Sequence, residues 1–124
     1  MPCILRRSGA VDAVTELSRA GKLPTAFVCF NDVVAVGAMA GLERLGLKVG
    51  QDVSVVGFDN IGDAAFTMPP LTTVDTHARQ LGETAAKLVL ESIREGNPIT
   101  PTTITKASLV VRGSTGQVLA NRRA

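Results

Sequence analysis

The chain has 124 residues, of which 45% are hydrophobic and 19% charged. This composition excludes an intrinsically disordered chain, which needs low hydrophobicity and high net charge, and the length corresponds to one domain. The net charge of +2 comes from 13 basic and 11 acidic residues; without the three arginines of residues 112–124, the balance is 10 against 11, or −1. The body therefore lacks the basic footprint of a nucleic-acid-binding domain, and the basic end is expected to be solvated.

The first elements predicted along the chain are a helix and a strand. A helix is predicted over residues 9–20, with Ser8 as its N-cap and Gly21 as its stop. The apolar run over 25–30 lacks polar alternation, which is typical of a strand buried on both faces of a parallel sheet.

The remaining elements continue the alternation of helices and strands. A helix rich in small residues is predicted over 33–45, and small residues allow a helix to approach its neighbour closely. A loop with two prolines then separates two strands, and a long helix begins at Thr76 or His77 and ends at about Glu95. The two strands are expected over 53–58 and 71–76, and a last extended segment over 102–111.

This order predicts an α/β fold with an open, mostly parallel sheet. Ligands of such sheets bind beyond the carboxyl ends of the strands. Asn31 and Asp32 follow one predicted strand directly, and Asp59 and Asn60 follow the next. We expect Asn31 or Asp32 to cap the following helix. Asp59 is either a turn former or a ligand-binding residue.

Sequence motifs for catalysis and for metal or cofactor binding are absent. The chain has no GxxxxGK[ST] phosphate loop, no GxGxxG fingerprint and no GxSxG elbow, and His77 is its only histidine. Cys3 and Cys29 form neither a zinc motif nor a disulfide framework. Paired carboxylates, Asp59 with Asp63 or Asp32 with Asp59, leave a Mg²⁺-binding receiver domain as an enzyme-like alternative. We expect no enzyme, no cofactor, no bound metal, no signal peptide and no membrane span.

Five segments, in this order and spacing, make the chain resemble the lactose/galactose repressor (LacI/GalR) family of transcriptional regulators. They cover about residues 8–115, and together they are far more specific than any one of them. They are PTAFVCFND with AVGAM (24–32 and 35–39), GLKVGQDVSVVGFDN (46–60), PPLTTV (69–74), LGETA (81–85) and LVVRGST (109–115).

The resemblance implies a C-terminal subdomain of the periplasmic-binding-protein-like (type I) effector-binding fold. In that fold, two α/β subdomains close over a small ligand, often a sugar or a nucleobase. By motif, Asn31, Asp59 and Thr76 would line the ligand cleft. The resemblance also implies a cytoplasmic homodimer, or a larger assembly, in which Val36, Phe66 and Met68 lie at the interface.

The resemblance covers only part of such a regulator. Residues 1–115 are expected to form a partial effector-binding domain with a crossover helix at 79–95, followed by a polar basic tail at 116–124. The helix-turn-helix that would contact DNA is not recognised, so DNA binding would require a separate N-terminal domain. The alternative is a fragment of an extracytoplasmic sugar-binding transport protein.

Overall fold

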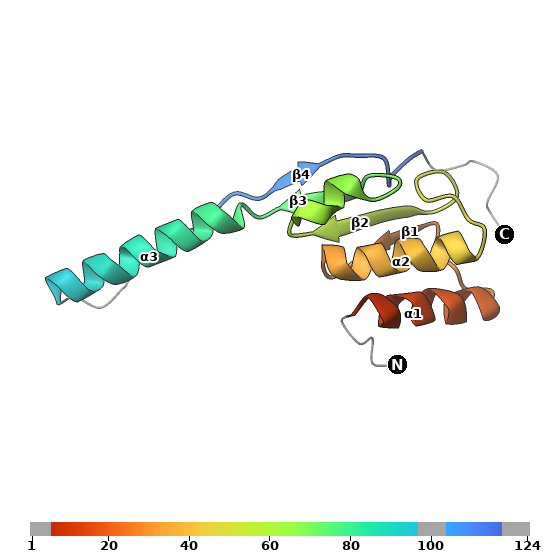
Figure 1. Cartoon of the computed structure of the whole chain (residues 1–124), viewed down its shortest axis with the longest axis horizontal. Helices are drawn as coiled ribbons and strands as arrows, with labels where there is room; N and C mark the ends of the chain where they lie inside the picture. The colour runs from red at the N-terminus through yellow and green to blue at the C-terminus, as the bar shows by residue number, and fades with distance from the viewer. Residues whose placement is uncertain (1–5, 97–103, 118–124) are drawn as a thin grey trace.

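A four-stranded sheet organises the computed structural model, which describes residues 6–96 and 104–117. The strands lie side by side in chain order, the first three parallel and the last antiparallel to its neighbour (Figure 1). This arrangement confirms the open, mostly parallel sheet predicted from the alternation of elements. The strands are β1 (Ala26–Val28), β2 (Ser54–Phe58), β3 (Thr72–Asp75) and β4 (Ser108–Val110).

The helices agree with the predicted segments to within two residues at each end. They are α1 (Arg7–Arg19), α2 (Asp32–Arg44) and α3 (Ala78–Glu95). The predicted cap at Ser8 is wrong, because α1 already begins at Arg7 and the preceding Arg6 makes no capping side-chain bond. A short 3₁₀ helix, η1 (Gly62–Phe66), was not predicted within the proline-containing loop.

The last predicted strand is shorter in the structure. β4 covers only Ser108–Val110 of the expected 102–111, and residues 104–107 carry no regular structure. Residues 97–103 and most of the predicted tail, 118–124, lie outside the described residues.

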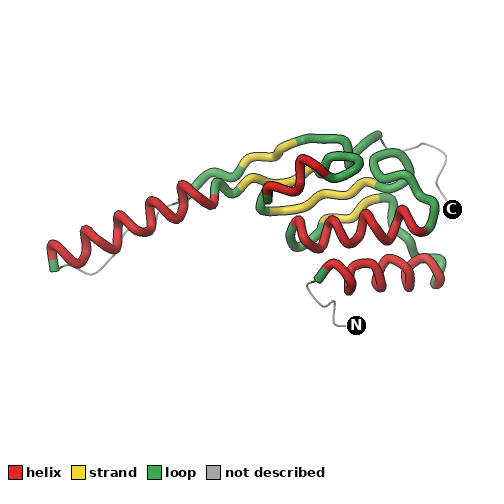
Figure 2. Tube along the Cα trace, in the orientation of Figure 1, coloured by secondary structure: helices red, strands yellow, loops and turns green. Residues whose placement is uncertain are grey.

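The hydrophobic core lies between α2 and one face of the sheet. α2 supplies Val34, Ala35, Ala38, Met39 and Leu42, all less than a tenth exposed. α1 packs along α2 through Ala10 and Val14, on the same side of the molecule (Figure 2). The remaining core residues come from the sheet region and η1, namely Val53, Val55, Ala64 and Leu71.

Close contact between α1 and α2 depends on two glycines of α2. A Cβ at Gly37 would collide with the backbone carbonyl of Arg7, and one at Gly41 would lie 3.1 Å from the Cβ of Val14. This confirms that the small residues of the predicted helix serve close packing.

The opposite face of the sheet is partly exposed, so the expectation that the strand over 25–30 is buried on both faces is wrong in this structure. Val28 is 86% exposed and Leu109 61%, and α3 has no buried residue. α3 extends beyond the sheet, away from α1 and α2 (Figure 1). Within the described part of the chain, no helix is long and apolar enough to cross a membrane.

Candidate functional site

The candidate site lies at one edge of the sheet. Because β1, β2 and β3 are parallel and adjacent, the residues that follow them share the carboxyl edge. Asn31 follows β1, Asp59 follows β2, and Thr76 follows β3. The topology thus places all three predicted ligand-binding residues at the carboxyl edge of the sheet.

Asn31 is the N-cap of α2, as expected for one of the two polar residues after β1. Its Oδ1 accepts a hydrogen bond of 2.9 Å from the Val34 amide. The side-chain NH₂ of Asn31 is not used by this cap, since the amide group donates through nitrogen and accepts through oxygen. The cap therefore uses only the side-chain oxygen of Asn31.

Asp32 is fully buried and connects three parts of the fold. Its Oδ1 accepts from the Thr73 hydroxyl at 2.5 Å, and its Oδ2 accepts from the Ile61 amide at 2.8 Å. A Cβ at Gly57 would collide with this carboxylate, so β2 passes Asp32 only because position 57 is glycine. Both carboxylate oxygens of Asp32 are therefore bonded within the fold. Asp59, which follows β2, is the exposed acid of the two.

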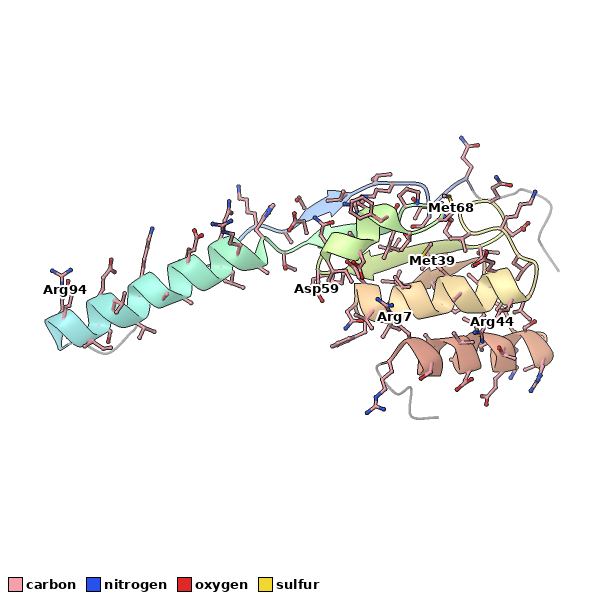
Figure 3. All side chains as sticks on the ribbon, in the orientation of Figure 1. Arg7, Met39, Arg44, Asp59, Met68 and Arg94 are labelled. Atoms are coloured by element: carbon pink, nitrogen blue, oxygen red, sulfur yellow. The ribbon has the colours of Figure 1, made fainter. Side chains whose placement is uncertain are left out.

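The turn at Asp59 and Asn60 is held in an unusual backbone conformation. Both residues have positive φ, 102° and 51°, which is costly for residues other than glycine. The Asp59 amide donates to the Val74 carbonyl at 2.9 Å, and the Asn60 amide to the Thr73 hydroxyl at 3.4 Å. These bonds hold the backbone while the Asp59 side chain remains exposed (Figure 3). Such strained, well-supported positions are typical of ligand-binding sites.

Arg112 and Asp75 fix the orientation of Asn60. Nη2 of Arg112 donates to Oδ1 of Asn60 at 2.8 Å, and Nδ2 of Asn60 donates to Oδ2 of Asp75 at 3.1 Å. Nη1 of Arg112 also donates to the Leu71 carbonyl at 2.7 Å. The expectation that the basic end is solvated is therefore wrong for Arg112, which is half-buried and joins two strand ends. Its position directly after the apolar run 109–111 is the one sequence feature that separates it from the arginines of the tail.

Asp75 and His77 shape the connection from β3 to α3. The His77 amide donates to Oδ1 of Asp75 at 2.7 Å, and this bond is the main cause that lowers the Asp75 pKa; the Asn60 side chain lowers it further. His77 has a φ of 51°, and its ring lies 3.4 Å from Asp75 and 3.5 Å from Ser108 of β4. Sequence reasoning missed Asp75, because an acid inside a predicted strand carries no motif.

The clustered-acid alternative receives no support from the described residues. Asp63 forms an ion pair with Arg7 at 3.5 Å, and Asp32 is bonded inside the fold. In the described part of the chain, no three His, Cys, Asp or Glu side chains come together as a metal site would require.

The predicted interface residues lie outside the carboxyl edge. Phe66, the last residue of η1, is 87% exposed, and Met68, which follows η1, is 90% exposed. Val36 is half-buried in a shallow groove between α1 and α2. Met68 lies near the α2 residue Met39, with which it lines a second shallow groove (Figure 3).

Comparison with known proteins places the chain beside bacterial regulators. Residues 4–115 match the family described as periplasmic binding protein-like domain. The chain is 37% identical over 111 residues to the HTH-type transcriptional repressor PurR of Aliivibrio fischeri strain MJ11, covering 85% of this chain and 33% of that protein. It is 44% identical over 86 residues to PurR of Vibrio campbellii, covering 69% of this chain and 26% of that protein.

Solved structures show the same likeness. The lac repressor dimer bound to operator and the anti-inducer ONPF matches with a TM-score of 0.83 and 33% identity, over 90% of this chain and 39% of that one. A LacI family transcriptional regulator from Enterococcus faecalis V583 with bound ribose matches with a TM-score of 0.87 and 31% identity, over 96% of this chain and 44% of that one. The chain spans only 26% to 33% of the length of the curated relatives named above.

Proposed function

We propose that this chain, which belongs to the periplasmic binding protein-like domain family, is the small-molecule-sensing and dimerisation module of a LacI-type transcriptional regulator. It corresponds to part of the effector-binding domain of such regulators. The relatives named above are repressors or transcription regulators, which favours this function over a transport protein or an enzyme. Regulators of this kind act on DNA, so we place the module in the cytoplasm and assign operator binding to a separate N-terminal domain.

The observation that carries the proposal is the Asp59 turn. Its backbone is held in a strained conformation by bonds to β3, while its carboxylate faces solvent at the carboxyl edge of the sheet. A carboxylate accepts two hydroxyl hydrogen bonds, and bonds to a charged acceptor are stronger than neutral ones. We therefore assign a sugar as the effector class, in line with the ribose bound to one structural relative.

Each proposed ligand-binding residue has a distinct role. Asp59 accepts hydrogen bonds from two ligand hydroxyls, and Asn31 donates through the NH₂ group that its capping role leaves available. Thr76, half-buried after β3, offers a hydroxyl that both donates and accepts.

The binding proposal is tested by titrating the ¹⁵N-labelled chain with ribose. We expect weak, millimolar binding that shifts the amide signals of Asp59–Ile61 and Thr76, and loss of these shifts in Asp59→Asn. Asp63→Asn is the matched control, because Asp63 is also exposed and lies in the same loop but pairs with Arg7. Shifts that persist in Asp59→Asn, or that cluster away from the carboxyl edge, would contradict the assignment.

We also propose that Val36, Phe66 and Met68 contribute to a homodimer interface. Two of them are large apolar side chains almost fully in solvent, and one structural relative is described as a dimer. We expect Met68→Lys to lower the average mass in sedimentation equilibrium, because it places a charge in the apolar contact. Gln51→Lys, at another exposed position that lines the same groove, is the control and should leave the average mass unchanged. An equal decrease in both variants would contradict a specific role of Met68.

A further inference from the structure

The Asp75 carboxylate is bonded to both of the segments that carry Asp59 and Thr76. Its Oδ2 accepts from Nδ2 of Asn60 at 3.1 Å, in the turn that begins at Asp59. Its Oδ1 accepts from the His77 amide at 2.7 Å. This second bond closes a turn around Thr76, because an aspartate that binds the amide two residues further on folds the chain between them. One half-buried side chain therefore joins the two turns.

The strand register brings these two segments together. Phe58 lies opposite Val74 in the parallel pair of β2 and β3, and the Asp59 amide donates to the Val74 carbonyl at 2.9 Å. The bond between the side chains of Asn60 and Asp75 lies one residue further along both segments. It therefore continues the connection between the strands past the end of β2, to the positions of the proposed ligand-binding side chains.

The side chain of Asn60 has the chemistry to bridge its two neighbours. Arg112 carries only donors and an ionised Asp75 only acceptors, whereas an amide side chain both donates and accepts. Nη2 of Arg112 donates to Oδ1 of Asn60 at 2.8 Å, so the NH₂ group is left to face Asp75. Both bonds include a charged partner, and such bonds are stronger than those between neutral groups.

We propose that Asp75 is a positioning residue of the effector site, which holds Asp59 and Thr76 at the spacing that the ligand requires. This inference rests on the proposed function, because Asp59 and Thr76 are the ligand-binding residues assigned there. Hydrogen bonds behind a binding side chain lock its position, and a site that is ordered before binding loses less free energy when the ligand arrives. Asp75 acts through other residues, since both its carboxylate oxygens are bonded to protein groups.

Exchanging the two side chains tests the link. In Asp75→Asn, the amide of residue 75 can accept from His77 or accept from Asn60, but it lacks a second acceptor, so one of the two bonds is lost. In Asn60→Asp, two carboxylates face each other and repel. In the double variant, the NH₂ group of residue 75 donates to the new carboxylate, whose other oxygen accepts from Arg112. Each bond is restored with donor and acceptor exchanged, and the net charge is unchanged.

Amide ¹⁵N relaxation of the free chain measures the link without a ligand. We expect each single variant to lower the order parameter in the segment that it does not itself alter, from about 0.85 to about 0.6 or less. Asp75→Asn acts in this way on Asp59 and Asn60, and Asn60→Asp acts on Thr76 and His77. The double variant should return both segments to the values of the unmodified chain. Amides of α2 should stay rigid in all four chains, which shows that the fold is intact.

Ribose binding, followed by the same amide signals, connects the link to the site. We expect the affinity to fall several-fold in each single variant and to recover in the double variant. Asp52→Asn is the matched control, because Asp52 also accepts from a backbone amide, that of Lys48 at 2.8 Å, but precedes β2. This control should change neither the order parameters of the two turns nor the affinity for ribose.

The outcomes that contradict this inference differ from the one that contradicts the proposed function. Unchanged order in the segment opposite each single substitution, or a double variant no more ordered than the single ones, would overturn the positioning role. Single variants that lose order but bind ribose as tightly as the unmodified chain would also overturn it. An unmodified chain whose amide signals do not respond to ribose would instead contradict the proposed function. The order parameters need no ribose, so they decide the role of Asp75 in that case as well.

Discussion

At the scale of single residues, the two polar residues after β1, Asn31 and Asp32, have different structural roles. Asn31 caps α2 through its side-chain oxygen, whereas Asp32 is buried and bonded to Thr73 and Ile61. Residue type predicts that one of the two is a cap, since both are favoured there. It does not predict that the other joins α2 to β3 and the Asp59 turn, because that role depends on contacts between residues far apart in the chain.

Removal of the Asp32 carboxylate should destabilise the whole fold. In Asp32→Ala, the Thr73 hydroxyl and the Ile61 amide would lose their acceptor in a buried site, so we expect a loss of about 3 kcal/mol. Urea unfolding followed by circular dichroism measures this change. Asp12→Ala, at an exposed position on α1, should change the free energy of unfolding by less than about 0.5 kcal/mol. Equal effects of the two substitutions would contradict the role assigned to Asp32.

Asp75 should make stability depend on pH in the acid range. Its folded pKa lies below the ordinary value of an aspartate, chiefly because of the bond from the His77 amide. Its ionised form therefore stabilises the fold above about pH 4, and this contribution is lost as the pH falls through the folded pKa. We expect the free energy of unfolding to fall less between about pH 6 and pH 2 in Asp75→Asn than in the unmodified chain. A ¹³C titration that gave Asp75 a pKa at or above the ordinary value of an aspartate would contradict this account.

At the scale of elements, hydrophobic pattern and glycine stops predicted the helices and parallel strands well. The 3₁₀ helix η1 was missed, because five residues are too few to show helical periodicity and the neighbouring prolines indicate only a loop. The early start of α1 was missed because its first turn carries no capping side chain. In the candidate site, Asp59 was predicted from its place after a strand, but its partners Asp75 and Arg112 come together only through the fold.

The contact between α1 and α2 should be sensitive to a single methyl group. A Cβ at Gly37 meets the Arg7 backbone, which cannot move without shifting α1, so we expect Gly37→Ala to cost about 2 kcal/mol. The same change at Gly82 of α3 has no atom within 4 Å and should increase the helical signal, since alanine favours a helix by about 1 kcal/mol over glycine. Thermal unfolding by circular dichroism measures both, and a destabilising Gly82→Ala would contradict the exposed position of α3.

At the scale of the whole molecule, the fold combines one well-packed layer with two uncovered surfaces. α1, α2 and η1 enclose the core on one side of the sheet, while Val28, Phe58 and Leu109 on the opposite face and the apolar residues of α3 are exposed. The sequence shows that α3 is amphipathic, but amphipathicity alone does not name the surface that a helix covers. The direction in which α3 leaves β3 is set by His77 and Asp75, and only the structure reveals it.

The exposure of α3 predicts that it is less protected than α2 in this chain. A helix without tertiary contacts is only marginally stable in water, and α3 has no buried residue, so its amides should exchange hydrogen much faster than those of α2. The amides of α2 should exchange slowly, because this helix supplies much of the hydrophobic core and opens only when the core is disrupted. Hydrogen exchange read by mass spectrometry measures both helices in one experiment. Exchange in α3 as slow as in α2 would contradict the exposed position of α3.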